Sequence, residues 1–152
     1  MDRISKAARS ENMRRLASKD TTPELAVRRL VHSLGYRYRL HRHDLPGRPD
    51  MVFPSRRKVI FVHGCFWHQH EECGGARIPK STKTYWAKKL RRNKQRDVEN
   101  PTKLSAIGWD SLVIWECSVG QTAELRRILK RFLGKPKQDP ERWQRKKRRQ
   151  AD

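Results

Sequence analysis

The chain has 152 residues, of which 35% are hydrophobic, and its 37 lysines and arginines against 16 acids give a formal net charge of +21. This length allows one domain, and a charge so far beyond the needs of solubility predicts a polyanionic partner. No apolar run approaches the roughly 20 residues of a membrane span, and residues 1–6 lack a signal peptide's apolar stretch, so we expect a cytoplasmic protein without a membrane partner.

The first predicted elements are an arm over residues 1–20, with some helix, and a helix that begins at Thr21–Glu24. A threonine cap, a proline in the first turn and an acid near the positive helix end favour this start. An apolar stripe at helical spacing predicts the buried face, and Gly35 is expected to end the helix. The stripe consists of Val27, Leu30, Val31 and Leu34.

Strands are predicted next, over residues 36–40, 50–53 and 58–62, with the last two paired across residues 54–57. A polar helix over 82–99, a turn from Pro101 to Gly108, a buried strand over 111–117 and a helix that ends near Gly134 follow. We therefore expect an α/β fold with a mixed central sheet flanked by helices. The domain would cover residues 21–134, followed by a basic tail over 135–152.

The three cysteines predict a metal site. Cys65, His70 and Cys73 lie within nine residues, and Cys117 ends a later predicted strand. Three thiolates and one imidazole form a closed tetrahedral set for a structural zinc ion. Two alternatives stay open: His63 or His68 replaces His70 as the fourth ligand, or the cysteines are ordinary thiols that bind no metal.

A second group suggests metal-dependent phosphodiester cleavage. Asp50 opens one strand and His63 ends its neighbour, which is the frame of many metal-dependent nucleases. Mg²⁺ prefers hard oxygen ligands such as a carboxylate and a backbone carbonyl. The acid and lysine usual on the second strand are absent, so His63 and His68 become candidates for proton transfer and Glu24 for the missing carboxylate. The simpler alternatives are a turn residue at Asp50, a helix-capping acid at Glu24, and histidines that support the zinc loop.

Several strings closely resemble the very-short-patch-repair (Vsr) endonuclease family over most of residues 5–120. They are Arg9-Ser10-Glu11-Asn12-Met13-Arg14, Asp20-Thr21, Gly47-Arg48-Pro49-Asp50, residues 59–62, His63-Gly64-Cys65-Phe66-Trp67-His68, Tyr85-Trp86 and Trp115-Glu116-Cys117. The resemblance implies a restriction-endonuclease-like fold with a structural zinc. It also implies that the chain nicks duplex DNA 5′ to the thymine of a T:G mispair left by deaminated 5-methylcytosine, which initiates very short patch repair.

The resemblance also implies roles for single residues. Asp50 would bridge two Mg²⁺ ions, Val62 would offer its main-chain oxygen, and Glu24 would contact metal-bound water. His68 would be the general base, and His63 would assist the phosphate chemistry. The zinc ligands would be Cys65, His70, Cys73 and Cys117. Two features depart from the best-known member: Val62 replaces a threonine, and the stretch between His70 and Cys73 is one residue longer.

Mispair recognition is expected from side chains that wedge into the helix, because a mispair stacks poorly. The resemblance assigns this role to Met13, Phe66, Trp67 and Trp86, whereas aromatic residues more often belong to a core. Lys89 and Asn93 share one face of the predicted helix with Asp97. They would reach base edges or phosphates, and a solvated face is the alternative.

The expected partner is duplex DNA with a T:G mismatch, bound by a monomer, with mismatch-repair proteins as further partners. Two rival functions remain. A zinc module that only binds DNA would need neither Asp50 nor His68. A restriction-type enzyme would dimerise on a palindrome and cut both strands of matched DNA.

Overall fold

The computed structural model describes residues 5, 7–8, 20–40, 42–78, 80 and 83–137. Helix α2 (Thr22–Ser33) is followed by strands β1 (Met51–Phe53) and β2 (Lys58–His63), helix α3 (Lys83–Ala106), strand β3 (Asp110–Trp115) and helix α4 (Thr122–Leu133). In the sheet, β2 lies between β1, to which it is antiparallel, and β3, to which it is parallel. The predicted α/β fold with a mixed sheet is confirmed.

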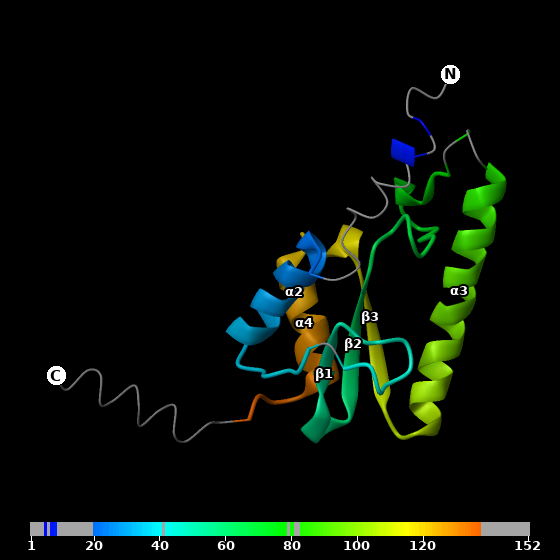
Figure 1. The fold of residues 1–152 in the computed structure, drawn as a ribbon. Coiled ribbons are helices and arrows are strands. Elements are labelled where there is room, and N and C mark those ends of the chain that lie inside the picture. Colours follow the sequence, from blue (N-terminus) through cyan, green and yellow to red (C-terminus); the bar gives the residue numbers. More distant parts are fainter. Residues whose placement is uncertain are drawn as a thin grey trace.

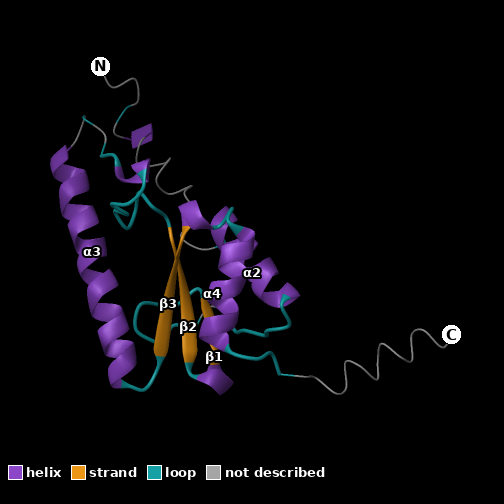
Figure 2. Ribbon diagram, turned by 180° about the vertical axis from the view of Figure 1, so that it is seen from behind, coloured by secondary structure: helices purple, strands orange, loops and turns teal. Residues whose placement is uncertain are grey.

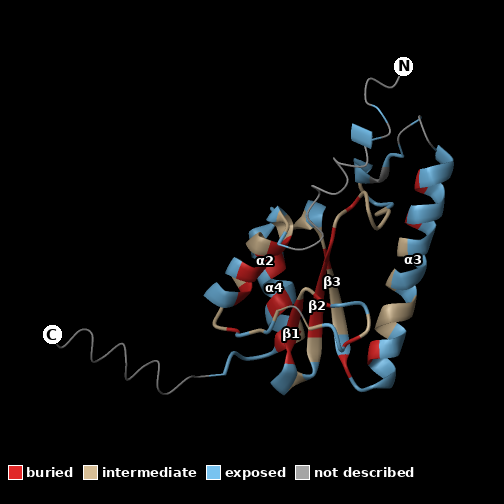
Figure 3. Ribbon diagram, viewed as in Figure 1, coloured by how far each residue is buried: buried red, intermediate tan, exposed pale blue. Residues whose placement is uncertain are grey.

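The sheet separates α3 on one face from α2 and α4 on the other, as the two opposite views in Figures 1 and 2 show. Neighbouring residues of β2 point to opposite faces, because strand side chains alternate. Ile60 and Val62 pack in the core with α2 and α4, whereas Val59 and Phe61 pack with Leu104 of α3. Figure 3 shows the most continuous burial along β1 and β2, so the core lies on both sides of these strands.

Helix α2 begins and ends as predicted. Thr21 is its N-cap residue, and Gly35 follows its end with a φ of +94°. The amides of Gly35 and Tyr36 donate to the carbonyls of His32 and Val31, which is the pattern that closes a helix through a left-handed residue. Within the described part of the chain, no helix is both long and apolar enough to cross a membrane.

Two predicted elements differ from the structure. Residues 36–40 form no strand, and only Arg39 makes an isolated bridge, to Val52. The alternation of Tyr and Arg there reflects the burial of Tyr36 and partial burial of Tyr38 rather than a sheet ladder. In addition, α3 continues through Pro101 to Ala106, where we expected a separate turn. Leu104, which is fully buried, explains this continuation, because its packing on the sheet compensates for the hydrogen bond that proline cannot donate.

The strand that leads to Cys117 is shorter and more exposed than predicted. Strand β3 ends at Trp115, and Cys117 lies in the 3₁₀ turn Glu116–Ser118 that follows it. Ile114 is the one buried residue of β3, and Cys117 itself is exposed. Most of the predicted arm and tail lie outside the described residues.

Candidate functional site

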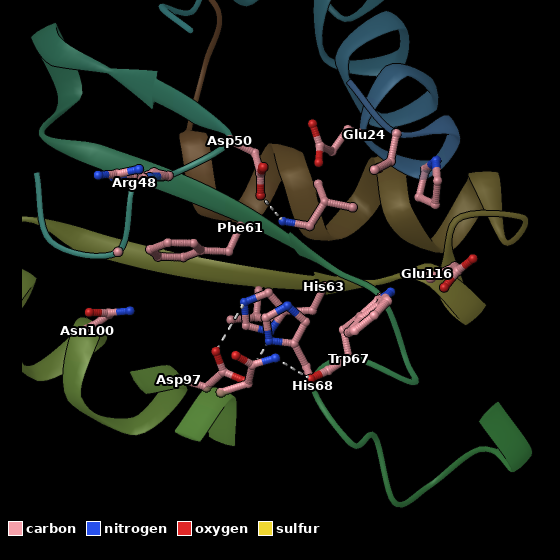
Figure 4. A pocket seen from close by; sticks show the side chains of 18 of the residues that line it. Glu24, Arg48, Asp50, Phe61, His63, Trp67, His68, Asp97, Asn100 and Glu116 are labelled. Atoms are coloured by element: carbon pink, nitrogen blue, oxygen red, sulfur yellow. Dashed lines mark hydrogen bonds and ion pairs between the residues drawn. The ribbon is translucent and has the colours of Figure 1, made fainter. Parts of the chain in front are cut away.

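A cleft of about 930 Å³ passes the end of β2, between the start of α2 and α3. Its walls come from the start of α2, the loop before β1, the end of β2 and one face of α3. Figure 4 shows Glu24 and Asp50 on one side of the end of β2, and His63, His68 and Asp97 on the other. The candidate catalytic residues therefore line one cleft although they are far apart in the sequence.

Asp50 directly precedes β1, and the edge of β2 holds it in place. Its backbone amide donates to the carbonyl of Ile60 at 3.1 Å, and its carboxylate accepts from the amide of Val62 at 2.6 Å. Burial raises the pKa of Asp50 to about 7; the Val62 hydrogen bond opposes this shift, and the negative charge of Glu24 adds to it. A half-buried acid with a second acid beside it favours a bound cation, because a cation would stabilise its ionised form.

Glu24 is the second acid, buried in the first turn of α2 with 4% of its surface exposed. Its Oε2 atom accepts hydrogen bonds from the amide of Asp20 at 2.8 Å and from Arg28 at 3.1 Å. Arg28 also contacts Asp20, at 2.6 Å. Glu24 therefore belongs to a buried ionic group at the cleft, which is more than the helix-capping alternative requires.

The catalytic candidates His63 and His68 stack on each other. Their rings are nearly parallel, with centroids 3.8 Å apart. His68 donates from Nδ1 to Asp97 of α3 at 2.7 Å, which leaves Nε2 as the nitrogen that can accept a proton. Burial, together with the neighbouring His68, lowers the pKa of His63 to about 4, although Asp97 opposes this shift. His63 is therefore a neutral imidazole near pH 7.

The sequence did not single out Asp97 as a site residue. It lies one helical turn after Asn93, so its place on the cleft face of α3 was predictable. Its partner, His68, was not predictable, because the two residues meet only when the loop after β2 packs against α3. The Asp97 carboxylate also lies 3.9 Å from Nε2 of His63, beyond hydrogen-bond distance, so it is close to both rings but binds only His68.

The four predicted zinc ligands come together in a separate cluster. The ligand atoms of Cys65, His70, Cys73 and Cys117 all lie within 4.8 Å of one another. Nδ1 of His70 is 3.7 Å from the sulfur of Cys65 and 3.4 Å from that of Cys117. Three sulfurs and one imidazole nitrogen fit a tetrahedral zinc site. The structure places His70 in this cluster, whereas His63 and His68 lie together with Asp97 in a separate group.

The cluster holds a tight loop at the end of β2. Burial raises the pKa of the Cys65 thiol to about 12, so a thiolate there needs a cation beside it. A Cβ atom on Gly75 would come within 2.9 Å of the Cβ atom of Cys65, so the chain passes there without room for a side chain. The loop between these residues carries Phe66, Trp67 and His68 into or beside the cleft.

Comparison with known proteins identifies the family. Residues 1–74 match the family described as DNA mismatch endonuclease Vsr. The chain is 49% identical over 132 residues to the type II nicking enzyme V.XorIIP of Xanthomonas oryzae pv. oryzae, covering 87% of this chain and 96% of that protein. The chain belongs to the Vsr family. It is also 40% identical over 114 residues to the DNA mismatch endonuclease Vsr of Escherichia coli, covering 75% of this chain and 72% of that protein.

In this Vsr family member, the predicted wedge residues form an aromatic cluster. The rings of Phe66, Trp67 and Trp86 have centroids 5.2 to 5.7 Å apart. Trp86 is 8% exposed, whereas Phe66 and Trp67 are partly exposed. Trp86 is therefore buried within this group, as the core alternative expects, and the partly exposed Phe66 and Trp67 pack against it. Met13 lies outside the described residues.

Lys89 and Asn93 line the cleft, but both contact Trp67. The Lys89 ammonium group lies over the Trp67 ring, 5.2 Å from its centroid, and Asn93 donates to the Trp67 carbonyl at 3.1 Å. The predicted polar face of α3 therefore fixes the loop of this Vsr family member in place, which neither expected role had included.

Proposed function

We propose that the chain nicks one strand of duplex DNA 5′ to the thymine of a T:G mispair by Mg²⁺-dependent hydrolysis, and so initiates very short patch repair. Membership of the Vsr family supports an endonuclease that acts on mismatched DNA. The observation that carries the finer proposal is that Asp50 and the His68–Asp97 pair line one cleft of a chain with a net charge of +21.

Asp50 and the main-chain oxygen of Val62 would hold the divalent cation, and Glu24 would contact its coordinating water. Their fit follows from the donor atoms, because the buried carboxylate of Glu24, the half-buried carboxylate of Asp50 and a peptide group offer the hard oxygens that Mg²⁺ prefers. When bound, two such ions would neutralise the scissile phosphate and stabilise the leaving oxygen.

His68 would remove the proton from the attacking water. Its Nδ1–H is bound to Asp97, so the ring is fixed in orientation and tautomer, with Nε2 free to accept. His63 would stay neutral and donate a hydrogen bond to the phosphate. Its Nδ1 atom is buried and has no hydrogen-bond partner among the described residues, so it would donate to a phosphate once DNA binding uncovers it.

The aromatic cluster would read the mispair. A poorly stacked pair costs less to open than a matched one, so an inserted side chain favours it. Phe66 and Trp67 would enter the helix from the loop, supported by Trp86, with Met13 of the N-terminal arm from the other side. Lys89 and Asn93 would contact DNA while they hold Trp67 in place.

A zinc ion bound to Cys65, His70, Cys73 and Cys117 would be structural. A site with four protein ligands has no open position for catalysis, so its effect is to fix the loop that carries His68 and Trp67. The mixed sheet flanked by helices supports a restriction-endonuclease-like core over 21–134, with the arm and tail as DNA-contacting segments. We further propose that the protein acts as a monomer in the cytoplasm, alongside mismatch-repair proteins.

The test is a nicking assay on a duplex with one T:G pair, beside the same duplex with a matched pair, with and without Mg²⁺. We expect one nick, 5′ to the mispaired thymine, only with Mg²⁺. Asp50→Ala should abolish nicking and still bind the duplex. Binding without nicking under any divalent cation would support a DNA-binding module, and double-strand cutting of matched DNA would support a restriction-type enzyme.

A further inference from the structure

A buried arginine lies at the acidic end of the cleft. Arg28 is 8% exposed, and its two terminal nitrogens contact Asp20 at 2.6 Å and Glu24 at 3.1 Å. The next residue, Arg29, is exposed. Burial of a guanidinium group is costly unless carboxylates compensate for it, so Arg28 is unlike the many solvated cations of this chain.

Arg28 constrains the acid that the proposed reaction uses. Glu24 receives two hydrogen bonds on the same oxygen, one from Arg28 and one from the amide of Asp20. An arginine presents its donors in a rigid planar fork, so a carboxylate bound to it has a fixed orientation as well as a nearby charge. Arg28 and Glu24 are one helical turn apart on α2, which keeps the pair aligned with the helix.

The influence of this pair extends to Asp50. The negative charge of Glu24 raises the pKa of Asp50, and the positive charge of Arg28 lowers it. Both charges therefore act at the carboxylate that is proposed to bind the cation. All three residues line the same cleft.

We propose that Arg28 is a positioning residue for the nicking reaction, which holds the Glu24 carboxylate beside Asp50 so that the two acids face the divalent cation together. This inference rests on the proposed function. The alternative is that Arg28 binds a DNA phosphate directly. Burial and the use of both terminal nitrogens by carboxylates argue against this alternative.

The first test compares Arg28→Met, which keeps the apolar stem without the charge, with the matched control Arg29→Met. We expect Arg28→Met to lower the nicking rate at saturating DNA about 10- to 100-fold, because small displacements of catalytic groups have effects of this size. Its Kd for the T:G duplex without divalent cations should stay unchanged, and Arg29→Met should nick as the wild type does. Arg28→Lys should recover part of the rate, since its ammonium group can reach one of the two acids.

The second test asks whether Arg28 acts through Glu24. If it does, Glu24→Gln combined with Arg28→Met should nick no more slowly than Glu24→Gln alone. If the rate losses of the two single variants multiply in the double variant, the inference is overturned. It is also overturned if Arg28→Met binds DNA more weakly without metal and the salt dependence of its Kd falls by about one charge, because this indicates a lost phosphate contact. Thermal unfolding monitors each variant, and if Arg28→Met does not fold, Arg28→Lys takes its place in the cycle. Failure of the proposed function itself would be seen in the wild type, which would then not nick the T:G duplex.

Discussion

The imidazole ring of His70 lies flat on the indole ring of Trp115, with centroids 4.2 Å apart and planes 9° from parallel. The same indole meets His63 at 5.2 Å and His68 at 6.4 Å, in both cases edge to face. One side chain at the end of β3 therefore separates the candidate zinc cluster from the candidate catalytic histidines. Because the Trp115 ring packs against histidines of both clusters, a change at this indole would reach the zinc ligands and the catalytic histidines alike.

The ring contacts of Trp115 predict that this residue supports catalysis without binding metal. Trp115→Leu should slow nicking about tenfold, because the loss of aromatic contacts worth roughly 0.5–1.5 kcal/mol each loosens the histidine stack. The zinc content should remain one ion per chain. Trp109→Leu, at a buried indole in the core below α3, is the matched control and should change stability more than rate. An unchanged nicking rate in Trp115→Leu would contradict the prediction. Loss of zinc from this variant would also contradict it, because the indole would then support the metal site rather than the histidines.

The hydrogen bond from His68 to Asp97 predicts a large effect of a small substitution. Asp97→Asn keeps the shape but removes the charge that orients and stabilises the imidazole, so the nicking rate should fall about 10²- to 10⁴-fold. Single-turnover nicking of the T:G duplex measures this rate, and fluorescence anisotropy should show unchanged DNA binding. Glu99→Gln, on the same helix, is the control. A loss of less than about threefold would show that His68 does not depend on Asp97.

Local sequence signals were sufficient for much of the fold. The turn at Gly35, the pairing of residues 50–53 with 58–62 and the helix that ends near Gly134 all follow from residues close in sequence. The strand predicted at 36–40 was wrong because alternation records burial, and Tyr36 is buried without a sheet partner. The end predicted for α3 was wrong because a local rule about proline was outweighed by the burial of Leu104.

The candidate site divides in the same way. The positions of Cys65, His70 and Cys73 on one loop were readable from their spacing, and a family resemblance pointed to Asp50 and His68. Asp97 and Arg28 were not singled out. The helix face of Asp97 and the one-turn spacing of Arg28 from Glu24 were readable, but neither pattern distinguishes a buried ionic contact from a solvated one. The contacts of Lys89 and Asn93 with Trp67 join segments more than 20 residues apart, which periodicity does not report.

The cysteine cluster predicts one tightly bound zinc ion per chain. Cys65→Ser should lose the ion, lower the thermal stability and abolish nicking, because metal binding contributes directly to the folding of such loops. Metal analysis measures the stoichiometry, and cobalt substitution should give a thiolate charge-transfer band in the wild type only. His32→Gln, at an exposed histidine on α2, is the control. A wild-type protein that is stable, active and free of zinc would refute the prediction.

The raised pKa of Asp50 predicts how stability depends on pH when Mg²⁺ is absent. The folded protein holds this proton up to about pH 7, whereas an unfolded chain releases it near the ordinary value of 3.8. The fold is therefore most favoured while Asp50 is protonated, and its stability declines as pH rises from about 4 to 7, by at most about 4 kcal/mol. Asp50→Asn removes this dependence, so it should be more stable than the wild type at pH 8 and much closer to it at pH 5. Urea unfolding in Mg²⁺-free buffer, with zinc retained, measures the difference, and Asp44→Asn, at an exposed acid, is the control.

Added Mg²⁺ should then stabilise the wild type and leave the stability of Asp50→Asn unchanged. Equal stabilisation of both would place the cation elsewhere.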